Sequence, residues 1–340
     1  SANRLIIARV ITRTLALHNP TLATSYGGGK SEREHVFVKI VAQGGDFGIG
    51  EGSPLPHFTG EHAATIAWAI ENVLAPALIG ANAADMAGIQ SRLEKALPEN
   101  GTAKTALVTA VYDLVGKVLG LPVCQLLGGR LRERVPVAWG VGIMPPDQTA
   151  AEARRLVGRG CSTIKLKVGV DPERDIAAVA ETRRAVGPGI PIRVDANQGY
   201  APKAALRALR GFRDYNVQYL EQPVAKDDLA SLSWLRRQSD VPIAVDESLY
   251  GPREAMEIIR HEAADVFVIK LIKAHGLSRA RQVLTIAEAA GIPCTLVSPY
   301  ETTVGVAANV HLAAAATNVP FACEVGVDPD LRDDPATGLQ

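Results

Sequence analysis

The sequence predicts an α/β fold, a (β/α)8 TIM-like barrel preceded by an α+β N-terminal unit. Two observations predict the barrel. From residue 135 onward, short runs of β-branched residues alternate with helical stretches, and they recur roughly every 25 to 28 residues, a spacing typical of βαβ units with parallel strands. The runs number eight, which is the number of strands that closes this kind of barrel.

The predicted barrel strands span residues 135–140, 163–168, 190–195, 217–221, 241–246, 265–270, 292–297 and 320–325. The helices predicted between them span residues 148–158, 172–185, 201–215, 229–238, 253–260 and 277–290. An open doubly wound sheet is the alternative architecture. Because no G-x-G-x-x-G sequence follows the first strand, nucleotide binding has no support.

The first third of the chain has a different pattern. Alternation at 5–17, 35–41 and 47–51 predicts three strands, and helical stretches follow at 61–75, 84–96 and 102–119. Gly128-Gly129 marks the boundary that we expect between the two parts. We therefore expect an α+β domain over 1–128, a catalytic barrel over 129–325 and a C-terminal tail over 326–340.

Composition excludes several classes of partner. Among 340 residues, 36 Lys and Arg balance 36 Asp and Glu, so the basic footprint of a nucleic-acid-binding protein is missing. The most apolar stretch, 310–316, is too short to span a bilayer, and the first residues do not resemble a signal peptide. The four cysteines form no C-x-x-C pair, which is typical of reduced thiols. We expect a cytoplasmic enzyme that acts on a small molecule.

Charged residues end five consecutive predicted strands. The second strand carries Lys165 and Lys167, and the sixth ends at Lys270. Lys165 and Lys167 alternate with apolar residues, so both point to one face of the strand, which is the interior of a barrel. Burying an unpaired charge is costly, so the charged groups at these strand ends must pair with one another or hold a cation.

Three carboxylates end the strands between the lysines: Asp195, Glu221 and Asp246. We expect them to converge, because the carboxyl ends of barrel strands meet at one mouth. Such a cluster needs a hard cation, and oxygen ligands suit Mg²⁺, with Mn²⁺ as a substitute. Lys167 and Lys270 flank the trio, and a neighbouring cation lowers the pKa of a lysine, which makes the neutral amine available as a base.

These motifs resemble the enolase superfamily. A K-x-K motif with a lone lysine on the sixth strand is similar to the muconate lactonizing enzyme subgroup of the mandelate racemase/muconate lactonizing enzyme family. The motifs are Lys165-Leu166-Lys167, Asp195-Ala196-Asn197, Glu221-Gln222-Pro223, Asp246-Glu247-Ser248 and Lys270. Residues 74–80 and 120–129 resemble the capping domain of that family, so the resemblance covers nearly the whole chain.

The resemblance implies a capping domain made of the N-terminal part and the returning C-terminal tail, a metal held by the three carboxylates, and a homo-oligomer. It also implies proton transfer by Lys167 and Lys270, with Lys165 as an accessory cation beside the substrate carboxylate. The loop around 25–30 corresponds to the flexible cap loop of the family. The residues expected to contact substrate are Tyr26, His57, Phe58, Asn197, Ser298, Tyr300 and Glu324.

The expected chemistry is removal of the proton α to a carboxylate, through a metal-stabilised enediolate, by an isomerase or lyase. A muconate cycloisomerase-like activity is the first choice. Alternatives are racemisation of an N-acylamino acid, epimerisation of a dipeptide, and o-succinylbenzoate synthesis. A Schiff-base aldolase on the same barrel leaves the carboxylate trio unexplained, and the intact set of charged residues argues against a non-catalytic binding protein.

Overall fold

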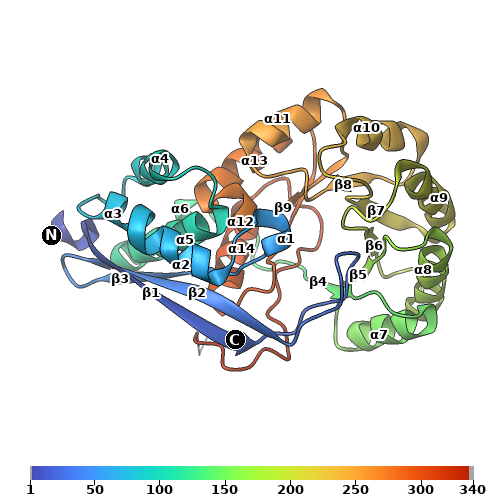
Figure 1. Cartoon of the computed structure of the whole chain (residues 1–340), viewed down its shortest axis with the longest axis horizontal. Helices are drawn as coiled ribbons and strands as arrows, with labels where there is room; N and C mark the ends of the chain where they lie inside the picture. The colour runs from blue at the N-terminus through green and yellow to red at the C-terminus, as the bar shows by residue number, and fades with distance from the viewer. Residues whose placement is uncertain (1, 337–340) are drawn as a thin grey trace.

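The computed structural model describes residues 2–336, which form a capping domain and a barrel side by side (Figure 1). The sheet of the capping domain is antiparallel with the order β1-β2-β3. The elements of this part are η1 (Ala2–Leu5), β1 (Ile7–His18), β2 (Glu32–Ala42), β3 (Phe47–Gly52), α1 (Pro56–Thr59), α2 (Ala63–Ala69), π-helix η2 (Ile70–Leu74), α3 (Ala75–Leu78), α4 (Met86–Ala96), α5 (Gly101–Leu119) and α6 (Val123–Leu126). The predicted strands and longer helices of this region are confirmed, with ends shifted by a few residues.

Helix α5 lies directly on strand β3, and two glycines make this approach possible. A Cβ on Gly48 would lie 2.0 Å from the carbonyl oxygen of Ala110, and one on Gly50 would lie 2.0 Å from that of Ala106. Any side chain at either position would push the helix off the sheet. The helix is buried along most of its length as a result.

The second part is the predicted parallel barrel. Its sheet has the order β10-β9-β8-β7-β6-β5-β4, so each strand pairs with its neighbour in sequence. Its elements are β4 (Ala138–Val141), α7 (Pro146–Gly158), β5 (Thr163–Lys167), α8 (Pro172–Val186), β6 (Ile192–Asp195), α9 (Pro202–Phe212), η3 (Arg213–Tyr215), β7 (Val217–Glu221), α10 (Leu229–Gln238), β8 (Ile243–Val245), α11 (Pro252–Arg260), β9 (Val266–Ile269), α12 (Leu271–Ala274), α13 (Leu277–Ala289), β10 (Cys294–Leu296) and α14 (Thr303–Ala315). The predicted α/β barrel class is confirmed.

The eighth predicted strand, 320–325, is reduced to two isolated bridges. Cys323 bridges Val137 beside the first strand, and Glu324 bridges Val297 beside the last. Pro320 cannot donate a hydrogen bond to a ladder, and only two residues pair, so no regular strand forms. The two bridges nevertheless join both edges of the sheet and close the ring.

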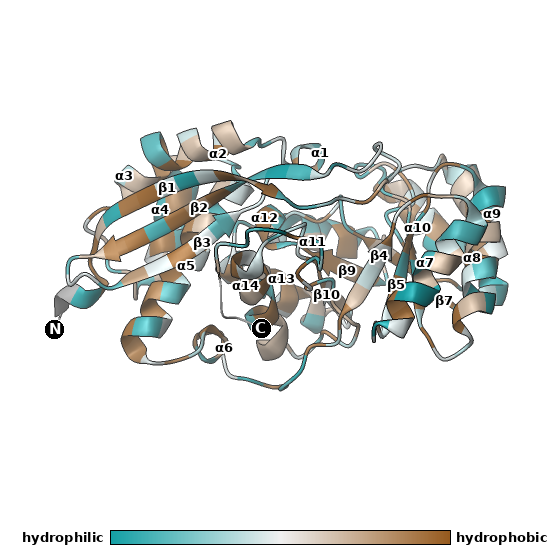
Figure 2. Ribbon diagram, turned by 90° about the horizontal axis from the view of Figure 1, so that it is seen from below, coloured by the Kyte–Doolittle hydropathy of each residue, from teal (hydrophilic) through white to brown (hydrophobic). Residues whose placement is uncertain are grey.

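Some of the barrel helices begin at a side-chain cap. Asp171 accepts a hydrogen bond from the Arg174 backbone at 2.8 Å, and Asp228 accepts one from that of Ser231 at 2.9 Å. Figure 2 shows hydrophilic and hydrophobic residues alternating around α8 and α9, which have one face toward the sheet. No helix in the described part of the chain is long and apolar enough to cross a membrane.

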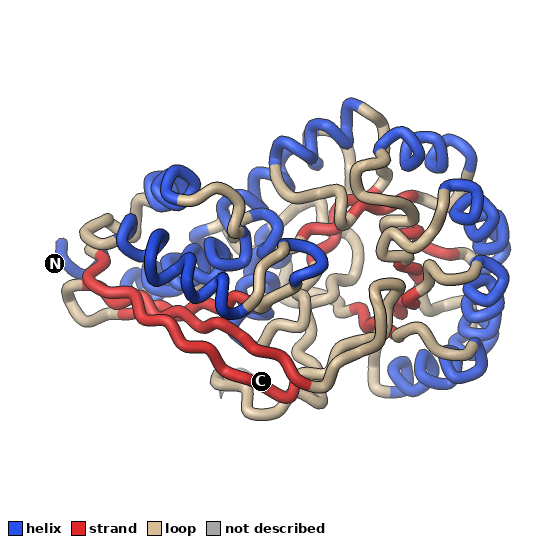
Figure 3. Tube along the Cα trace, in the orientation of Figure 1, coloured by secondary structure: helices blue, strands red, loops and turns tan. Residues whose placement is uncertain are grey.

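Two segments connect the capping domain to the barrel beyond the main interface. The loop between β1 and β2 leaves the cap sheet and reaches the barrel strands (Figure 3), where the Ser25 hydroxyl donates to the Ala196 carbonyl at 2.9 Å. The C-terminal tail reaches the end of β1, where the Arg332 backbone donates to the His18 carbonyl at 3.0 Å. Residues 337–340 of the expected tail lie outside the described residues.

A buried carboxylate at the end of β3 anchors the capping domain to the barrel. Glu51 accepts hydrogen bonds from the Thr302 hydroxyl at 2.6 Å and from the Gly305 backbone at 3.0 Å, both at the start of α14. It also contacts the ring of buried His35 at 2.8 Å. A negative charge at a helix N-terminus is favourable, so this contact fixes the loop before α14 against the cap sheet.

A second buried carboxyl, Glu301, lies next to this anchor. Its Oε2 accepts from the Ser298 hydroxyl at 2.6 Å and from the Asn309 amide at 2.9 Å, whereas its Oε1 has no partner among the described residues. Burial, together with the charge of Glu51, raises the pKa of Glu301 to about 8. Glu301 is therefore protonated in the folded protein at neutral pH.

This raised pKa predicts a pH-dependent stability. The folded protein holds the Glu301 proton more tightly than the unfolded chain, so its stabilising contribution is complete below pH 4 and is lost as pH rises through about 8. We expect Glu301→Gln, which mimics the neutral acid, to weaken the decline in free energy of unfolding between pH 5 and 9. The measurement is urea unfolding across this range, with exposed Glu133→Gln as the control. Identical slopes in the parent and Glu301→Gln would contradict the assignment.

Candidate active site

The structure brings the predicted lysines and carboxylates together at the carboxyl ends of adjacent barrel strands. In the sheet register Lys167 pairs with Asp195, and Asp195 pairs with Glu221. Asp246 directly follows β8 and Lys270 directly follows β9. The order of the strands therefore places the three carboxylates in a row, with one lysine at each end of it.

At the β5 end of this row, two lysines share the carboxylates. Lys165 Nζ lies 3.1 Å from Asp195 Oδ2, 2.8 Å from Glu221 Oε1 and 3.0 Å from Glu324 Oε1. Lys167 Nζ lies 2.5 Å from Asp195 Oδ2. Lys165 is buried, and its ammonium is compensated by three carboxylates, as burial of a charge requires.

At the β9 end, Asp246 holds two lysines. Lys270 donates to Asp246 Oδ2, and Lys273 Nζ lies 2.6 Å from Asp246 Oδ1. Lys273 is fully buried and also donates to the Asp246 backbone carbonyl. Sequence reasoning missed Lys273, although its position three residues after Lys270, on the same helical turn of α12, is a signal that could have found it.

Burial and the charges of neighbouring side chains together shift the pKa values of the lysines and carboxyl groups in this cluster. Burial alone would lower the pKa of Lys167, but the charge of Asp195 outweighs burial and raises it. The expected lowering of a lysine pKa depends on a neighbouring divalent cation, so it stays a prediction. Burial opposes ionisation of Asp195, but Lys165 and Lys167 prevail and lower its pKa. For Glu221, burial and the neighbouring Asp195 together raise the pKa well above the ordinary value.

The three carboxylates Asp195, Glu221 and Asp246 offer the oxygen donors of a metal site, and in this structure they pair with lysines. Within residues 2–336, no group of three or more His, Cys, Asp and Glu side chains has the arrangement of a metal site, and lysine ammonium groups lie against the carboxylates. Glu221 Oε2 is nevertheless buried and lacks a hydrogen-bond partner in the described structure. An orphaned carboxylate oxygen and repulsion from Asp195 are what a hard cation would relieve, so the donor set fits Mg²⁺.

Three of the residues expected to contact substrate form an aromatic group beside Lys270. The rings of Tyr26 and His57 are stacked with centroids 5.4 Å apart, and Phe58 meets Tyr26 edge-on at 6.0 Å. Lys270 Nζ lies 4.6 Å from the centre of the Phe58 ring. The β1–β2 loop and helix α1, which carry these rings, belong to the capping domain, so the cap supplies an aromatic wall to the barrel mouth.

The other expected substrate residues have mixed positions. Asn197 Oδ1 accepts from Lys167 at 2.9 Å, and Glu324 binds Lys165 as described above. The Ser298 hydroxyl is already engaged with Glu301. The Tyr300 hydroxyl accepts from the Leu22 backbone at 3.2 Å, so it supports the loop between β1 and β2. The structure therefore brings Asn197 and Glu324 to the charged cluster and gives Ser298 and Tyr300 supporting contacts.

Sequence reasoning also missed the role of Gln222. It has a positive φ of 36°, and its Oε1 accepts from the Asp246 backbone at 3.0 Å and from the Ser248 backbone at 3.1 Å. These bonds tie the loop after β7 to the loop after β8. Gln222 thereby fixes the backbone that carries Asp246, and its place in the Glu221-Gln222-Pro223 motif could have indicated this.

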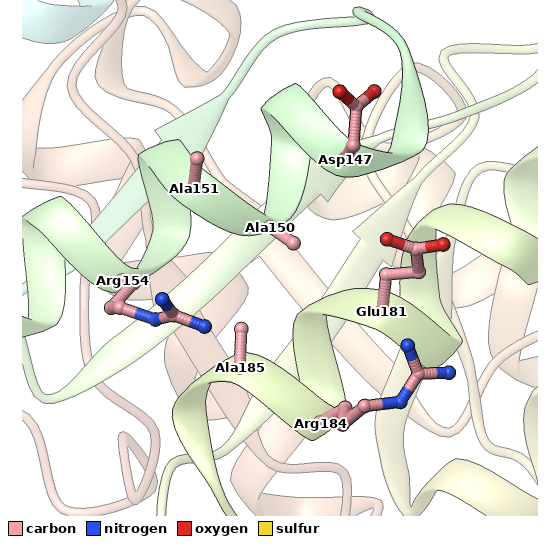
Figure 4. A pocket seen from close by; sticks show the side chains of 7 residues that line it. All are labelled: Asp147, Ala150, Ala151, Arg154, Glu181, Arg184 and Ala185. Carbon is pink, nitrogen blue, oxygen red and sulfur yellow. The ribbon is translucent and has the colours of Figure 1, made fainter.

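A hollow on the outside of the barrel is unrelated to this cluster. It lies between α7 and α8 and is lined mainly by Asp147, Arg154, Glu181 and Arg184 (Figure 4). Most of these charged side chains are solvent-exposed. Solvated charges on two outer helices do not provide the perturbed, desolvated groups that catalysis uses, so the candidate active site is the barrel mouth.

Comparison with known proteins agrees with this architecture. Residues 6–128 match the mandelate racemase / muconate lactonizing enzyme N-terminal domain, and residues 148–339 match the enolase C-terminal domain-like family. The L-Ala-D/L-Glu epimerase of Bacillus subtilis (strain 168) is 39% identical over 289 residues, which cover 84% of this chain and 79% of that protein. Muconate cycloisomerase 1-1 of Acinetobacter lwoffii is 36% identical over 316 residues, which cover 92% of this chain and 82% of that protein.

A solved structure is also similar over nearly the whole chain. The dipeptide epimerase from Enterococcus faecalis V583, complexed with Mg and the dipeptide L-Leu-L-Tyr, superposes with a TM-score of 0.90 at 35% identity and covers 93% of this chain and 89% of that one. A capping domain beside a barrel with charged strand ends defines an enzyme of the enolase superfamily, of the isomerase class. The chain belongs to the mandelate racemase/muconate lactonizing enzyme family.

The shared ion pairs of Lys165 predict a large cost for its removal. Lys165→Met leaves Asp195 and Glu221 buried beside each other with one cation fewer, and breaking a buried pair in this way costs about 3 to 5 kcal/mol. We expect the free energy of unfolding in urea, without divalent cations, to fall by about this amount. Exposed Lys203→Met serves as the matched control and should change it by less than about 0.5 kcal/mol. Equal stability of the two variants would contradict this account of the cluster.

Proposed function

We propose that this enzyme is an epimerase of dipeptides or a racemase of N-acylamino acids. It removes the proton α to the substrate carboxylate and returns a proton from the opposite face. The observation that carries the proposal is the position of Lys167 and Lys270 at the two ends of the carboxylate row. A 1,1-proton transfer needs an acid/base group on each side of the substrate carbon, and this row offers both.

Similarity to known enzymes supports this choice over muconate cycloisomerisation. The relative at 39% identity is an L-Ala-D/L-Glu epimerase. The similar solved structure from Enterococcus faecalis V583 is a dipeptide epimerase. The aromatic wall of Tyr26, His57 and Phe58 suits the apolar part of a peptide or acyl substrate. Muconate cycloisomerase-like activity, the first choice from sequence, becomes the second candidate and is supported by the relative at 36% identity.

The chain's own residues account for the proton chemistry. Lys167 and Lys270 alternate as base and acid: the neutral amine of one accepts the α-proton, and the ammonium of the other donates a proton to the opposite face. Lys165 remains an ammonium, since the charges of Asp195 and Glu221 outweigh burial and raise its pKa well above the ordinary value. A fixed positive charge of this kind stabilises the negative charge that develops on the substrate carboxylate.

We propose Mg²⁺ as the cofactor, held by Asp195, Glu221 and Asp246. The unpartnered, buried Glu221 Oε2 supports this assignment, and so does the Mg in the complex of the Enterococcus faecalis relative. When bound, the ion stabilises negative charge on the substrate carboxylate. A Schiff-base aldolase, which uses a lysine as nucleophile, would leave the row of three carboxylates without a role.

The proposed function predicts the active substrates. A parallel assay of dipeptides, N-succinylamino acids and cis,cis-muconate, with Mg²⁺, should show epimerisation or racemisation of the first or second class. The measurement is chiral chromatography of the products together with ultraviolet absorbance for muconate. Turnover of muconate alone would reverse the order of the two candidates, and no turnover of any class would reject both.

The metal assignment predicts the effect of one neutralising substitution. Asp246→Asn should abolish Mg²⁺ binding and activity while the fold survives, because an uncharged amide is a poorer ligand for a hard cation. Isothermal titration calorimetry measures binding and circular dichroism checks the fold. Exposed Asp240→Asn is the matched control and should bind Mg²⁺ as the parent does. Retained Mg²⁺ affinity in Asp246→Asn would overturn the assignment.

The two-base mechanism predicts opposite stereochemical losses. Lys167→Ala should abolish exchange of the α-proton with deuterium from solvent for one substrate stereoisomer, and Lys270→Ala for the other. We expect each loss to be roughly 10²- to 10⁴-fold, the usual contribution of a general acid or base. Nuclear magnetic resonance of each stereoisomer in D₂O gives the rates. Loss of both exchanges in one variant and of neither in the other would mean that a single lysine does the chemistry.

A further inference from the structure

A continuous line of hydrogen bonds runs from the capping domain to Lys167. The Tyr26 hydroxyl, in the loop between β1 and β2, donates to Glu247 Oε1 at 2.6 Å. The Asn197 amide nitrogen donates to the same oxygen at 3.0 Å. Lys167 Nζ in turn donates to Asn197 Oδ1 at 2.9 Å. Four side chains from four separate parts of the chain are thus connected in series.

This line fixes which way the Asn197 amide faces. A carboxylate oxygen only accepts hydrogen bonds, so Glu247 selects the amide nitrogen and turns Oδ1 toward the ammonium of Lys167. The reversed amide would present N–H groups to that ammonium. The backbone of Asn197 is itself held, since its N–H donates to Asp195 Oδ1 at 2.9 Å. With the backbone held, the amide group of Asn197 can still be turned over, and its hydrogen bond to Glu247 selects one of the two orientations.

The docked loop supports Glu247 in this role. Tyr26 approaches the same oxygen that Asn197 uses, and Gln198 donates to the Tyr26 hydroxyl. The Ser25 hydroxyl lies 2.9 Å from the Ala196 carbonyl and 3.0 Å from that of Asn197. The loop therefore contacts the very segment that holds the partner of Lys167.

Lys270 has no corresponding hydrogen-bonded connection. It donates to Asp246, and its ammonium lies over the face of the Phe58 ring. Phe58 meets the Tyr26 ring edge-on, so within the described residues the Tyr26 loop reaches Lys270 through ring contacts and not through a hydrogen bond. Docking of that loop thus acts unequally on the two lysines that flank the carboxylate row.

We infer that Tyr26 and Glu247 are positioning residues for Lys167, acting through Asn197, so that the Tyr26 hydroxyl orients one of the two acid/base lysines and not the other. This inference rests on the proposed function, because it assumes that the two lysines serve opposite faces of the substrate. It assigns the Tyr26 hydroxyl a role in the rate of proton transfer at one face, separate from contact of its ring with the substrate.

The test is Tyr26→Phe, which keeps the aromatic ring and its stacking and removes only the hydroxyl. Deuterium exchange from solvent is measured separately for each stereoisomer of an active substrate, and Lys167→Ala and Lys270→Ala identify which stereoisomer each lysine serves. We expect exchange through Lys167 to fall roughly 10- to 100-fold, the cost of misplacing a reacting group, and exchange through Lys270 to change by less than about twofold. An equal fall in both would overturn the inference, as would no fall in either.

A matched control and a substrate-free measurement separate this inference from the proposed function. Tyr215→Phe removes a hydroxyl at the opposite, amino end of β7 and should leave both exchange rates as in the parent. Asparagine-selective ¹⁵N labelling, with Asn197→Asp to assign the signal, follows the Asn197 side-chain amide without substrate. Tyr26→Phe should shift that signal or speed its exchange with water, and an unchanged signal would overturn the inference. Absence of any turnover in the parent would instead reject the proposed function.

Discussion

Compensation of buried charge inside a closed barrel is the constraint on which the rest of the site depends. Lys165, Asp195 and Glu221 are each almost completely inaccessible to solvent, and none could remain charged there alone. The parallel strands deliver these side chains to one mouth because their carboxyl ends coincide. The positions of the lysines are therefore set by the carboxylates before any ligand is present.

The capping domain contributes contacts to the barrel mouth through Glu51 and Tyr26. Glu51 fixes the start of α14, and with it the loop that carries Tyr300. The loop between β1 and β2 brings Tyr26 to Glu247. Both contacts join residues that are far apart in sequence, so the pocket wall and the barrel strands form one hydrogen-bonded unit.

Much of this arrangement could be predicted from sequence, and the failures have physical reasons. Strand periodicity and charged strand ends located Lys167, Asp195 and Lys270, because parallel strands convert a sequence spacing into a spatial cluster. The eighth strand was overestimated because β-branched composition reports propensity, whereas pairing at Cys323 and Glu324 is limited by local geometry. Lys273 and the Tyr26 hydrogen bond were missed because tertiary contacts of this kind leave no periodic signal.

The predicted lowering of the lysine pKa depends on a divalent cation at the carboxylates, and it stays a prediction. The prediction assumed a cation beside Lys167, whereas in the structure Asp195 is the dominant neighbour and raises the pKa of Lys167. Asp195 Oδ2 already contacts the ammonium groups of both Lys165 and Lys167, so a further positive group would compete with them for this oxygen. Any ligand that competes for Asp195 therefore weakens its hold on Lys167 and favours the neutral amine. Binding of a cation at the carboxylates and deprotonation of Lys167, the proposed base, are therefore coupled.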